Sequence, residues 1–309
     1  MRTRARIIAQ CPRASIIFEM RVLIVGCGYV GLPLGAELVR LGHEVHGLRR
    51  TARGAAELRA ARISPLVADI TKPDDLVKLP REFDWVVNCV ATSGGTTEDY
   101  RRIYLDGARN LVDWLSSAPP QKLVYTSSTS VYGQMDGSLV VETSATEPGS
   151  ETGRILLQTE RVLLESGIPA IILRLAGIYG PERGYWLKQF LQGTAKIEGE
   201  GKRILNMVHR DDVIGAVIET LGKSRSREIY NLVDDEPVTQ LECLRWLAAT
   251  LGKPMPPFAP EDEPEVRKRG VTNKEVSNRK LKQELDYRFK YPTFREGFEV
   301  ELKRLGHMR

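Results

Sequence analysis

Short unbroken apolar runs alternate along this chain with stretches whose apolar residues recur at helical spacing. The clearest case begins at residues 22–25, an apolar run that stops at a glycine-rich turn, residues 26–31. Leu34, Leu38 and Leu41 then fall on one face of an expected helix, and a glycine follows as a typical helix stop. This pattern predicts a buried strand, a tight turn and a helix.

The alternation of strands and helices continues to residue 175, which predicts an α/β fold with a Rossmann-like, doubly wound parallel sheet. We expect the Rossmann-like domain to span residues 20–175 and to be rejoined by 206–233. Residues 176–205 and 234–309 would form a smaller C-terminal lobe. We expect strands at residues 43–48, 65–68, 85–90, 122–126, 170–175 and 228–233, and helices at 52–61, 98–116, 151–160, 185–191, 213–221 and 239–251.

The glycine-rich turn has the spacing G-x-G-x-x-G of a dinucleotide-binding site. Gly26 would form the tight turn, Gly28 would let the backbone of Tyr29 and Val30 approach a pyrophosphate, and Gly31 would let the helix pack closely on the strand. The helix N-terminus would offer N–H groups and the positive end of its dipole to the phosphates. The flanking strand and helix favour this interpretation over a structural turn without a ligand.

Two arginines, Arg49 and Arg50, follow the second expected strand, about twenty residues past the last glycine of the motif. A carboxylate there would bond the ribose 2′-hydroxyl of NAD, whereas a guanidinium binds a 2′-phosphate through charge-assisted bonds. The sequence therefore predicts NADP(H), with NAD(H) as the alternative. The arginines could instead simply begin the solvated helix that follows.

Two later strand ends are expected to contact the same cofactor. Asp69 and Ile70 follow the strand at 65–68, where a carboxylate could accept a hydrogen bond from the adenine amino group. Ala91 opens a stretch of small residues, 91–95, which suits a strand that passes beneath a cofactor.

The composition is that of a globular protein, with 42% apolar and 28% charged residues and no apolar run near the ~20 residues that cross a bilayer. The net charge is +5, but residues 1–19 alone hold four arginines and one glutamate. We therefore expect neither a nucleic-acid nor a membrane partner. The four cysteines and four histidines show no metal-ligand spacing, which predicts no metal site and a reducing, cytoplasmic location.

Two segments differ in composition from the rest. Residues 1–19 are Arg-rich like a targeting segment but lack an apolar core and a cleavage site. We therefore interpret them as a disordered tail, or as the result of a start codon assigned too early, before Met20. Residues 253–270 combine five prolines with an acidic run. This composition predicts a covering loop or a mobile segment, with a lid over a substrate as the functional interpretation.

Several segments resemble the extended short-chain dehydrogenases/reductases, the family of nucleotide-sugar epimerases and dehydratases. The sequence LVYTSSTSVYG at 123–133 is similar to the family's SS-x-S-VYG segment, and residues 167–181, 206–218 and 228–233 are similar to its later strands and helix. The resemblance implies an NAD(P) cofactor, a small-molecule substrate that is sugar-like or nucleotide-linked, and a homodimer formed through helices 98–116 and 152–166.

The chain departs from the family at its catalytic Y-x-x-x-K pair. Alignment of residues 151–160 places Thr152 at the tyrosine position and Leu156 at the lysine position. In the family, i,i+4 spacing puts both groups on one helix face, and the lysine lowers the phenol's pKa from about 10. Threonine and leucine cannot do this. The chain therefore resembles an atypical subgroup that has G-x-G-x-x-G and lacks Y-x-x-x-K.

Other residues are candidates for substrate contact. Ser128 stands at the family's Ser/Thr position, where a hydroxyl bonds the substrate oxygen. Arg154 could stabilise an oxyanion or a phosphate, or form a salt bridge on the helix surface, and Thr152 is a catalytic candidate by position alone. Tyr132 and Tyr179 are phenols that could donate a proton or only pack.

Three polar residues precede the helix at 213–221. We interpret Asp211 and Asp212 as helix-start residues rather than catalysts, and His209 as a structural histidine rather than a contact in the cleft.

Two functions fit these observations. The first is an NADP(H)-binding oxidoreductase-type enzyme whose acid or base is not among the residues that the family uses. The second is a non-catalytic NADP(H)-binding sensor or assembly protein, which would explain Thr152 and Leu156 directly. An open, polar substrate cleft would favour the enzyme, and a cleft filled by side chains would favour the sensor.

Overall fold

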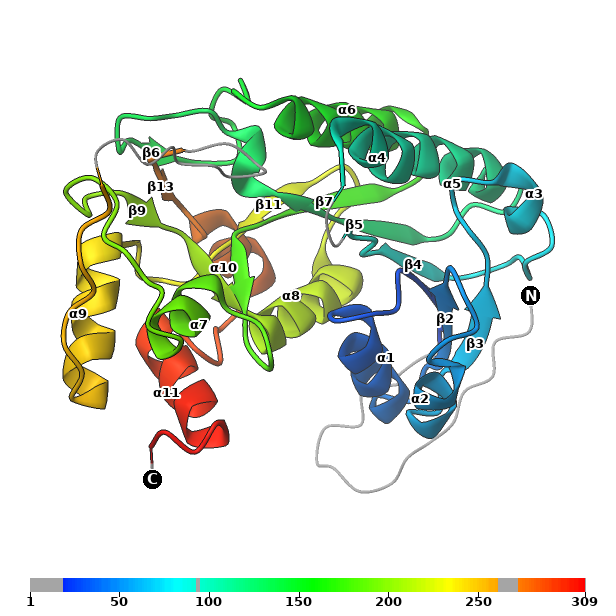
Figure 1. Ribbon diagram of the computed structural model, residues 1–309. Coiled ribbons are helices and arrows are strands. Elements are labelled where there is room, and N and C mark those ends of the chain that lie inside the picture. Colours follow the sequence, from blue (N-terminus) through cyan, green and yellow to red (C-terminus); the bar gives the residue numbers. More distant parts are fainter. Residues whose placement is uncertain (1–18, 93–94, 261–271, 309) are drawn as a thin grey trace. The chain divides into compact units, whose positions relative to one another are not determined.

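The computed structural model describes residues 19–92, 95–260 and 272–308. Seven strands form one sheet in the order β11-β7-β5-β4-β1-β2-β3, and the registered pairs within it are parallel (Figure 1). The strands of this sheet are β1 Arg21–Val25, β2 Glu44–Arg49, β3 Ser64–Val67, β4 Trp85–Asn88, β5 Lys122–Ser128, β7 Ala170–Leu175 and β11 Ile229–Leu232. The Rossmann-like α/β fold expected from the sequence is confirmed.

The first strand, β1, lies between β2 and β4 and is hydrogen-bonded to both. Its residues 22–25 are fully buried, because a parallel sheet is covered on both faces. This double covering explains why the sequence shows an unbroken apolar run there rather than an alternation.

Strand order reverses on either side of β1, and in sheets of this kind ligands bind beyond the carboxyl ends of the strands.

One compact unit comprises residues 19–92 and 95–126 together with 158–171 and 225–228. Within it, α1 and α2 lie on one face of strands β1–β3, and α4 and α5 lie on the other (Figure 1). Its helices are α1 Gly31–Arg40, α2 Ala55–Ala60, α3 Pro73–Leu76, α4 Thr97–Tyr100, the π-helical stretch η1 Arg101–Asp106 and α5 Gly107–Leu115. The helix α6, Glu151–Glu165, is divided between the two units.

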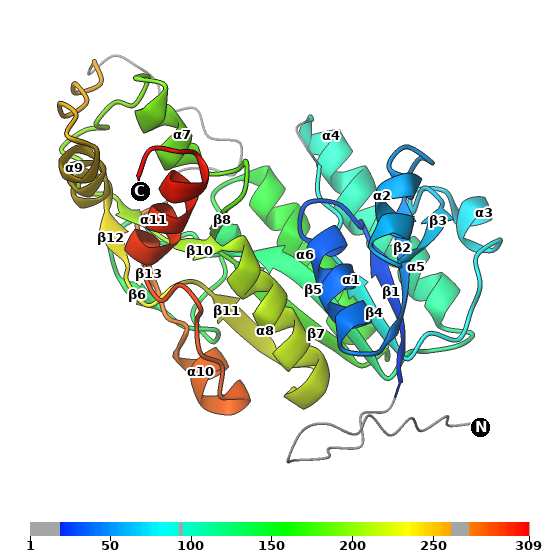
Figure 2. The same cartoon turned by 90° about the horizontal axis from the view of Figure 1, so that it is seen from below.

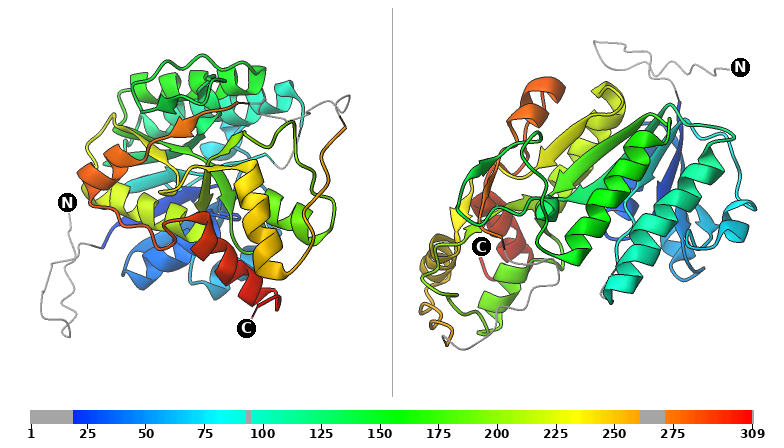
Figure 3. Two further views of the ribbon diagram at one scale, coloured as in Figure 1. Left: turned by 90° about the vertical axis from the view of Figure 1, so that its left-hand side faces the viewer. Right: turned by 90° about the horizontal axis from the view of Figure 1, so that it is seen from above.

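A second compact unit comprises residues 127–157, 172–224, 229–260 and 272–308. Its helices α7, α9 and α11 gather around one apolar core that includes Trp186, Leu244 and Phe298 (Figures 2 and 3). The domain boundaries expected from the sequence stay a prediction.

The remaining elements are the 3₁₀ turn η2 Thr129–Val131, β6 Leu139–Val140, β8 Gly177–Tyr179, α7 Tyr185–Leu191, β9 Ile204–Leu205, β10 Met207–His209, α8 Arg210–Lys223, β12 Val238–Thr239, α9 Gln240–Leu251, β13 Glu275–Val276, α10 Arg279–Leu285 and α11 Phe294–Arg304.

Several element ends differ from the sequence-based expectation for local reasons. The helix expected at 52–61 begins only at Ala55, because Gly54 before it has a left-handed φ of 82°. The strand expected at 85–90 ends at Asn88, whose side chain accepts a hydrogen bond from Val90 N at 3.3 Å and diverts the chain. The long helix expected at 98–116 is interrupted by the π-helical stretch.

Parts of three sequence-based predictions lie outside the described residues. They are residues 1–18 of the expected tail, residues 93–94 of the small-residue stretch and residues 261–270 of the expected covering loop. Within the described ranges, no helix has both the length and the apolar composition needed to cross a bilayer.

Candidate functional site

The turn after β1 requires glycine at two positions. Gly26 has a φ of 83°, and a Cβ atom there would lie 2.7 Å from the backbone N of Val90. At Gly31, the first residue of α1, a Cβ would lie 2.9 Å from both Gly26 O and Ile24 Cγ2. These are the tight turn and the close helix–strand packing that the sequence predicts.

Gly28 is different, because its α-carbon faces open space. The closest atom to a Cβ built there is Gly26 O at 3.9 Å, although Gly28 N is fixed by a 2.7 Å hydrogen bond to the same carbonyl. The N-cap residue of α1, Val30, provides no capping side chain, and the first turn holds no acid. Tyr29 completes the turn. Backbone exposed beside an uncapped helix N-terminus fits the pyrophosphate of a dinucleotide.

Arg49 joins the end of β2 to this turn. Its Nε donates to Cys27 O at 2.7 Å, and its Nη1 forms an ion pair with Glu57 at 3.1 Å. Arg50, the next residue, is exposed. Both cations thus lie beyond the carboxyl end of β2, where the sequence predicts contact with a ribose phosphate, but Arg49 already has a carboxylate partner.

The other expected cofactor residues occupy two further strand ends. Asp69 accepts hydrogen bonds from the backbone N and the hydroxyl of Thr71 through one carboxylate oxygen, at 3.0 and 2.8 Å. Ile70 is buried, and its carbonyl accepts a hydrogen bond from the Asn110 side chain. Ala91 is exposed beyond the end of β4. Their roles toward a cofactor stay predictions.

Of the two cysteines near the turn, Cys27 is buried and Cys89 is half-buried. Cys27 packs against Gly47, where a Cβ would lie 2.8 Å from its sulfur. Burial raises the pKa of the Cys27 thiol to about 12 and raises that of Cys89 as well. Since the thiolate is the reactive form, neither cysteine is a nucleophile at neutral pH.

The second unit contains two adjoining cavities, of about 260 and 190 Å³. The larger has aromatic walls, including Trp186 and Phe298, and the polar side chains of Arg203 and Asn206. The smaller lies at the carboxyl ends of β5 and β7 and is lined by Ser128. The residues that line both are Thr129, Gly177, Thr272 and Lys274.

Ser128, the residue at the family's Ser/Thr position, is therefore at a cavity wall. It is the last residue of β5, and its Oγ accepts a hydrogen bond from Ser130 N at 3.2 Å. This bond orients the Ser128 hydroxyl at the cavity wall. A substrate oxygen in the cavity would lie within reach of the residues that line it.

Lys274 is a buried lysine that the sequence analysis missed. Its Nζ donates to Tyr132 O at 3.0 Å and to Thr272 Oγ1 at 2.8 Å, and both acceptors are neutral. Burial lowers the pKa of Lys274 to about 8. In the sequence, T-N-K-E at 272–275 resembles a solvated loop after the proline-rich stretch, so only the tertiary structure reveals the burial.

The residues of α6 do not line either cavity. Thr152 Oγ1 is 3.2 Å from Ser150 Oγ, and Leu156 is buried. Arg154 forms an exposed i,i+3 ion pair with Glu151 at 2.8 Å, which is the helix-surface salt bridge that the sequence left open as an alternative. Their catalytic roles have no support in this geometry.

The two candidate phenols have different surroundings. Tyr132 donates to Asn231 Oδ1 and accepts from Arg174 Nη1, each at 2.8 Å, so its hydroxyl belongs to a buried network. Tyr179 lines the larger cavity, and its hydroxyl has no hydrogen-bond partner among the described residues. Burial raises the pKa of both phenols, which disfavours their phenolate forms.

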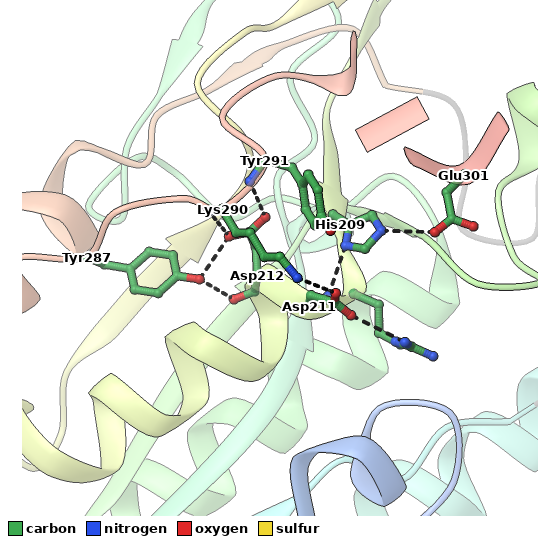
Figure 4. A network of polar contacts seen from close by, with 8 residues as sticks. His209, Asp211, Asp212, Tyr287, Lys290, Tyr291 and Glu301 are labelled. Atoms are coloured by element: carbon green, nitrogen blue, oxygen red, sulfur yellow. Dashed lines mark hydrogen bonds and ion pairs between the residues drawn. The ribbon is translucent and has the colours of Figure 1, made fainter. Parts of the chain in front are cut away.

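The polar residues at the start of α8 form a network of polar contacts (Figure 4). His209 is the N-cap of α8, and its Nδ1 accepts from Asp211 N at 3.1 Å. Asp212 accepts from the Tyr287 hydroxyl and from the backbone N of Lys290 and Tyr291, at 2.6–3.0 Å. The expected placement of Asp211 and Asp212 at the start of the helix is confirmed, and the structural role of His209 stays an interpretation that its N-cap position supports.

Comparisons with known proteins agree with this geometry. A model of the NAD dependent epimerase/dehydratase family matches residues 22–232. Protein YeeZ of Escherichia coli (strain K12) is 34% identical over 221 residues, which cover 69% of this chain and 77% of that protein. A 3-diazoavenalumate denitrifying reductase from a Streptomyces species is 27% identical over 266 residues, which cover 78% of this chain and 84% of the reductase.

Solved structures show the same relationship. A protein from Methylobacillus flagellatus, solved as a candidate NAD-dependent epimerase/dehydratase, is 30% identical and has a TM-score of 0.75. The alignment covers 93% of this chain and 98% of that one.

Proposed function

Because this chain belongs to the NAD dependent epimerase/dehydratase family, which confirms the resemblance found in its sequence, we propose that it is an NADP(H)-binding oxidoreductase-type enzyme. Its substrate would be a small molecule that is sugar-like or nucleotide-linked. The family is NAD(P)-dependent, and the choice of NADP(H), the substrate class and a cytoplasmic location belong to the proposal.

The cofactor would be held by the turn after β1 and by the strand ends beside it. The open backbone at Gly28 and the uncapped start of α1 would bind the pyrophosphate. Arg49 and Arg50 would bind the ribose 2′-phosphate. Asp69, Ile70 and Ala91 would contact the adenosine and nicotinamide portions. When bound, the cofactor supplies or removes a hydride at a substrate carbon.

The observation that favours an enzyme over a sensor is the cavity at Ser128, whose lining includes polar side chains. Thr152 and Leu156 in α6 favour a non-catalytic protein, because they cannot form the family's proton relay. A sensor, however, has no need of an open pocket of about 190 Å³ whose lining includes four hydroxyl-bearing residues and a lysine beside Leu175 and Ala176. Ser128 would hold the substrate oxygen there.

Turnover tests this proposal. We expect the purified protein to oxidise NADPH in the presence of one or more members of a panel of keto-sugars and nucleotide-linked keto-sugars, followed as loss of NADPH absorbance. Ser128→Ala should reduce kcat by about tenfold to a hundredfold, since one hydrogen bond to the developing charge is lost. Tight NADPH binding without turnover on the whole panel would replace the enzyme by the sensor.

The preference for NADP(H) is tested at Glu57, the exposed carboxylate that pairs with Arg49. Glu57→Gln removes a negative charge beside the expected 2′-phosphate and releases a guanidinium. We therefore expect NADPH to bind about two- to fivefold more tightly while NADH binding is unchanged. Calorimetric titration of both nucleotides measures the effect.

A matched control is Glu37→Gln, which breaks another exposed ion pair with an arginine, Arg40, in the same unit. It should alter neither affinity. If Glu57→Gln instead weakens NADH and leaves NADPH unchanged, Glu57 binds a ribose 2′-hydroxyl and the cofactor is NAD(H). Arg49→Asp is a poorer test, because Arg49 also holds the turn through Cys27 O.

A further inference from the structure

Lys274 is an unusual side chain outside the expected cofactor site. It is 3% exposed, and the two groups that it contacts through hydrogen bonds, Tyr132 O and Thr272 Oγ1, carry no charge. Burial of an ammonium group without a carboxylate partner is unfavourable, and a purely structural role would be filled better by a neutral residue. Such groups concentrate at functional sites.

Among the described residues, no carboxylate lines either cavity with Lys274. The charged or titratable side chains that line the larger cavity with it are Arg203, Tyr179 and Tyr185, and Arg203 is paired with Glu198 at 2.8 Å. The smaller cavity adds two serines and two apolar residues, none of them charged. Desolvation alone lowers the pKa of Lys274 to about 8, so that the amine can exchange a proton near neutral pH.

The backbone around Lys274 is fixed on both sides. Asn206 donates to Lys274 O and accepts from Val276 N, both at 2.9 Å. Asn273 Oδ1 accepts from Ile204 N at 2.9 Å, and β13 pairs with β6. These contacts hold the amine in place at the wall of both cavities.

An ammonium group has three N–H donors, and two of those of Lys274 are used. The third has no acceptor among the described residues. Lys274 and Ser128 line the same cavity, which puts an amine and a hydroxyl beside a substrate bound there. This is the arrangement that the missing Tyr/Lys pair would otherwise provide.

We propose that Lys274 is the catalytic acid and base of this cavity, and that it exchanges a proton with the substrate oxygen that Ser128 orients. This inference rests on the proposed function. In the reducing direction, the substrate oxygen gains the proton that leaves Lys274 Nζ, the carbonyl carbon gains the hydride supplied by the reduced nicotinamide, and the neutral amine then takes a proton from water. In the oxidising direction, the neutral amine accepts the proton of the substrate hydroxyl.

Three variants test this assignment. Lys274→Met should lower kcat at least a hundredfold while NADPH affinity, measured by calorimetry, is unchanged. Lys274→Arg keeps the positive charge but has a pKa too high for proton exchange, so it should also lower kcat at least a hundredfold. Lys280→Met is the matched control. Lys280 also donates to a backbone carbonyl, Ile229 O, but lines neither cavity, and its variant should keep wild-type kcat.

A direct readout of the amine accompanies the kinetics. NMR titration of protein labelled with ¹³C at lysine Cε should show one lysine resonance that titrates near pH 8 and is absent in Lys274→Met. The rate of carbonyl reduction should fall above that pH.

The outcomes separate the two levels of the proposal. Full activity of Lys274→Arg would show that Lys274 only binds an anion, and full activity of Lys274→Met would show that it has no role; either result overturns the inference alone. NADPH binding without wild-type turnover on the substrate panel would refute the proposed function and the inference with it. Circular dichroism of each variant shows whether it is folded.

Discussion

The Gly28→Ala protein is expected to fold normally and to bind NADPH about tenfold to a hundredfold more weakly than the wild-type chain. An added Cβ meets nothing in the protein closer than Gly26 O at 3.9 Å, so the fold has room for it. The same methyl group would occupy the space through which the pyrophosphate approaches the backbone. Loss of one or two charge-assisted backbone hydrogen bonds corresponds to about 1.5–3 kcal/mol. Thermal melts and calorimetric titration measure the two effects separately.

Gly26→Ala is the matched comparison in the same turn. Its Cβ would lie 2.7 Å from Val90 backbone atoms, and an L-residue is strained at a φ of 83°. We expect the free energy of unfolding to fall by about 3 kcal/mol or more. Unchanged NADPH affinity in the folded Gly28→Ala protein would show that the nucleotide does not contact this turn.

The second large effect concerns stability. Lys274→Met is expected to stabilise the protein at pH 7, although it abolishes activity, because it removes a buried ammonium that pairs with no carboxylate among the described residues. The lowering of the lysine pKa from 10.5 to about 8 corresponds to a loss of folding stability of at most about 3.4 kcal/mol at pH 7. The variant also loses two hydrogen bonds of about 1 kcal/mol each. The free energy of unfolding of Lys274→Met should therefore exceed that of the wild-type protein by about 1–2 kcal/mol.

The pH dependence of this gain distinguishes its cause. Because the folded pKa is lowered, the unfolded wild-type chain binds more protons between pH 8 and 10.5, and wild-type stability rises with pH across that window relative to the variant. The advantage of Lys274→Met should therefore shrink as pH rises from 8 to 10.5. Denaturant unfolding at pH 7 and pH 10 measures the difference in stability between Lys274→Met and the wild-type protein. If Lys274→Met is less stable than the wild-type protein by the same amount at both pH values, the lysine is structural.

The elements around β1 could be predicted because their physical causes are local. A buried parallel strand gives an unbroken apolar run, and two glycines of the turn, Gly26 and Gly31, are required by a backbone conformation or a close approach that the spacing encodes. Strand β7 and helix α7 have the expected bounds. The element ends that differ depend on single side chains such as Asn88, which sequence patterns do not resolve.

The candidate catalytic site could be predicted only in part. Ser128 lies at a cavity wall, as the family resemblance implies, whereas Thr152 and Arg154 are on a helix that lines neither cavity. Lys274 could not be found from the sequence. Its burial depends on Asn206, 68 residues earlier, and on the pairing of β13 with β6. Contacts so distant in sequence have no periodicity to reveal them.

Calorimetric titration of NADPH into the purified wild-type protein tests the central claim most directly, since every other step depends on the nucleotide cradle at Gly26–Gly31. We predict saturable binding of one NADPH per chain, with a weaker affinity for NADH under the same conditions. Absence of detectable binding for both nucleotides would contradict the assignment of this turn as a cofactor site.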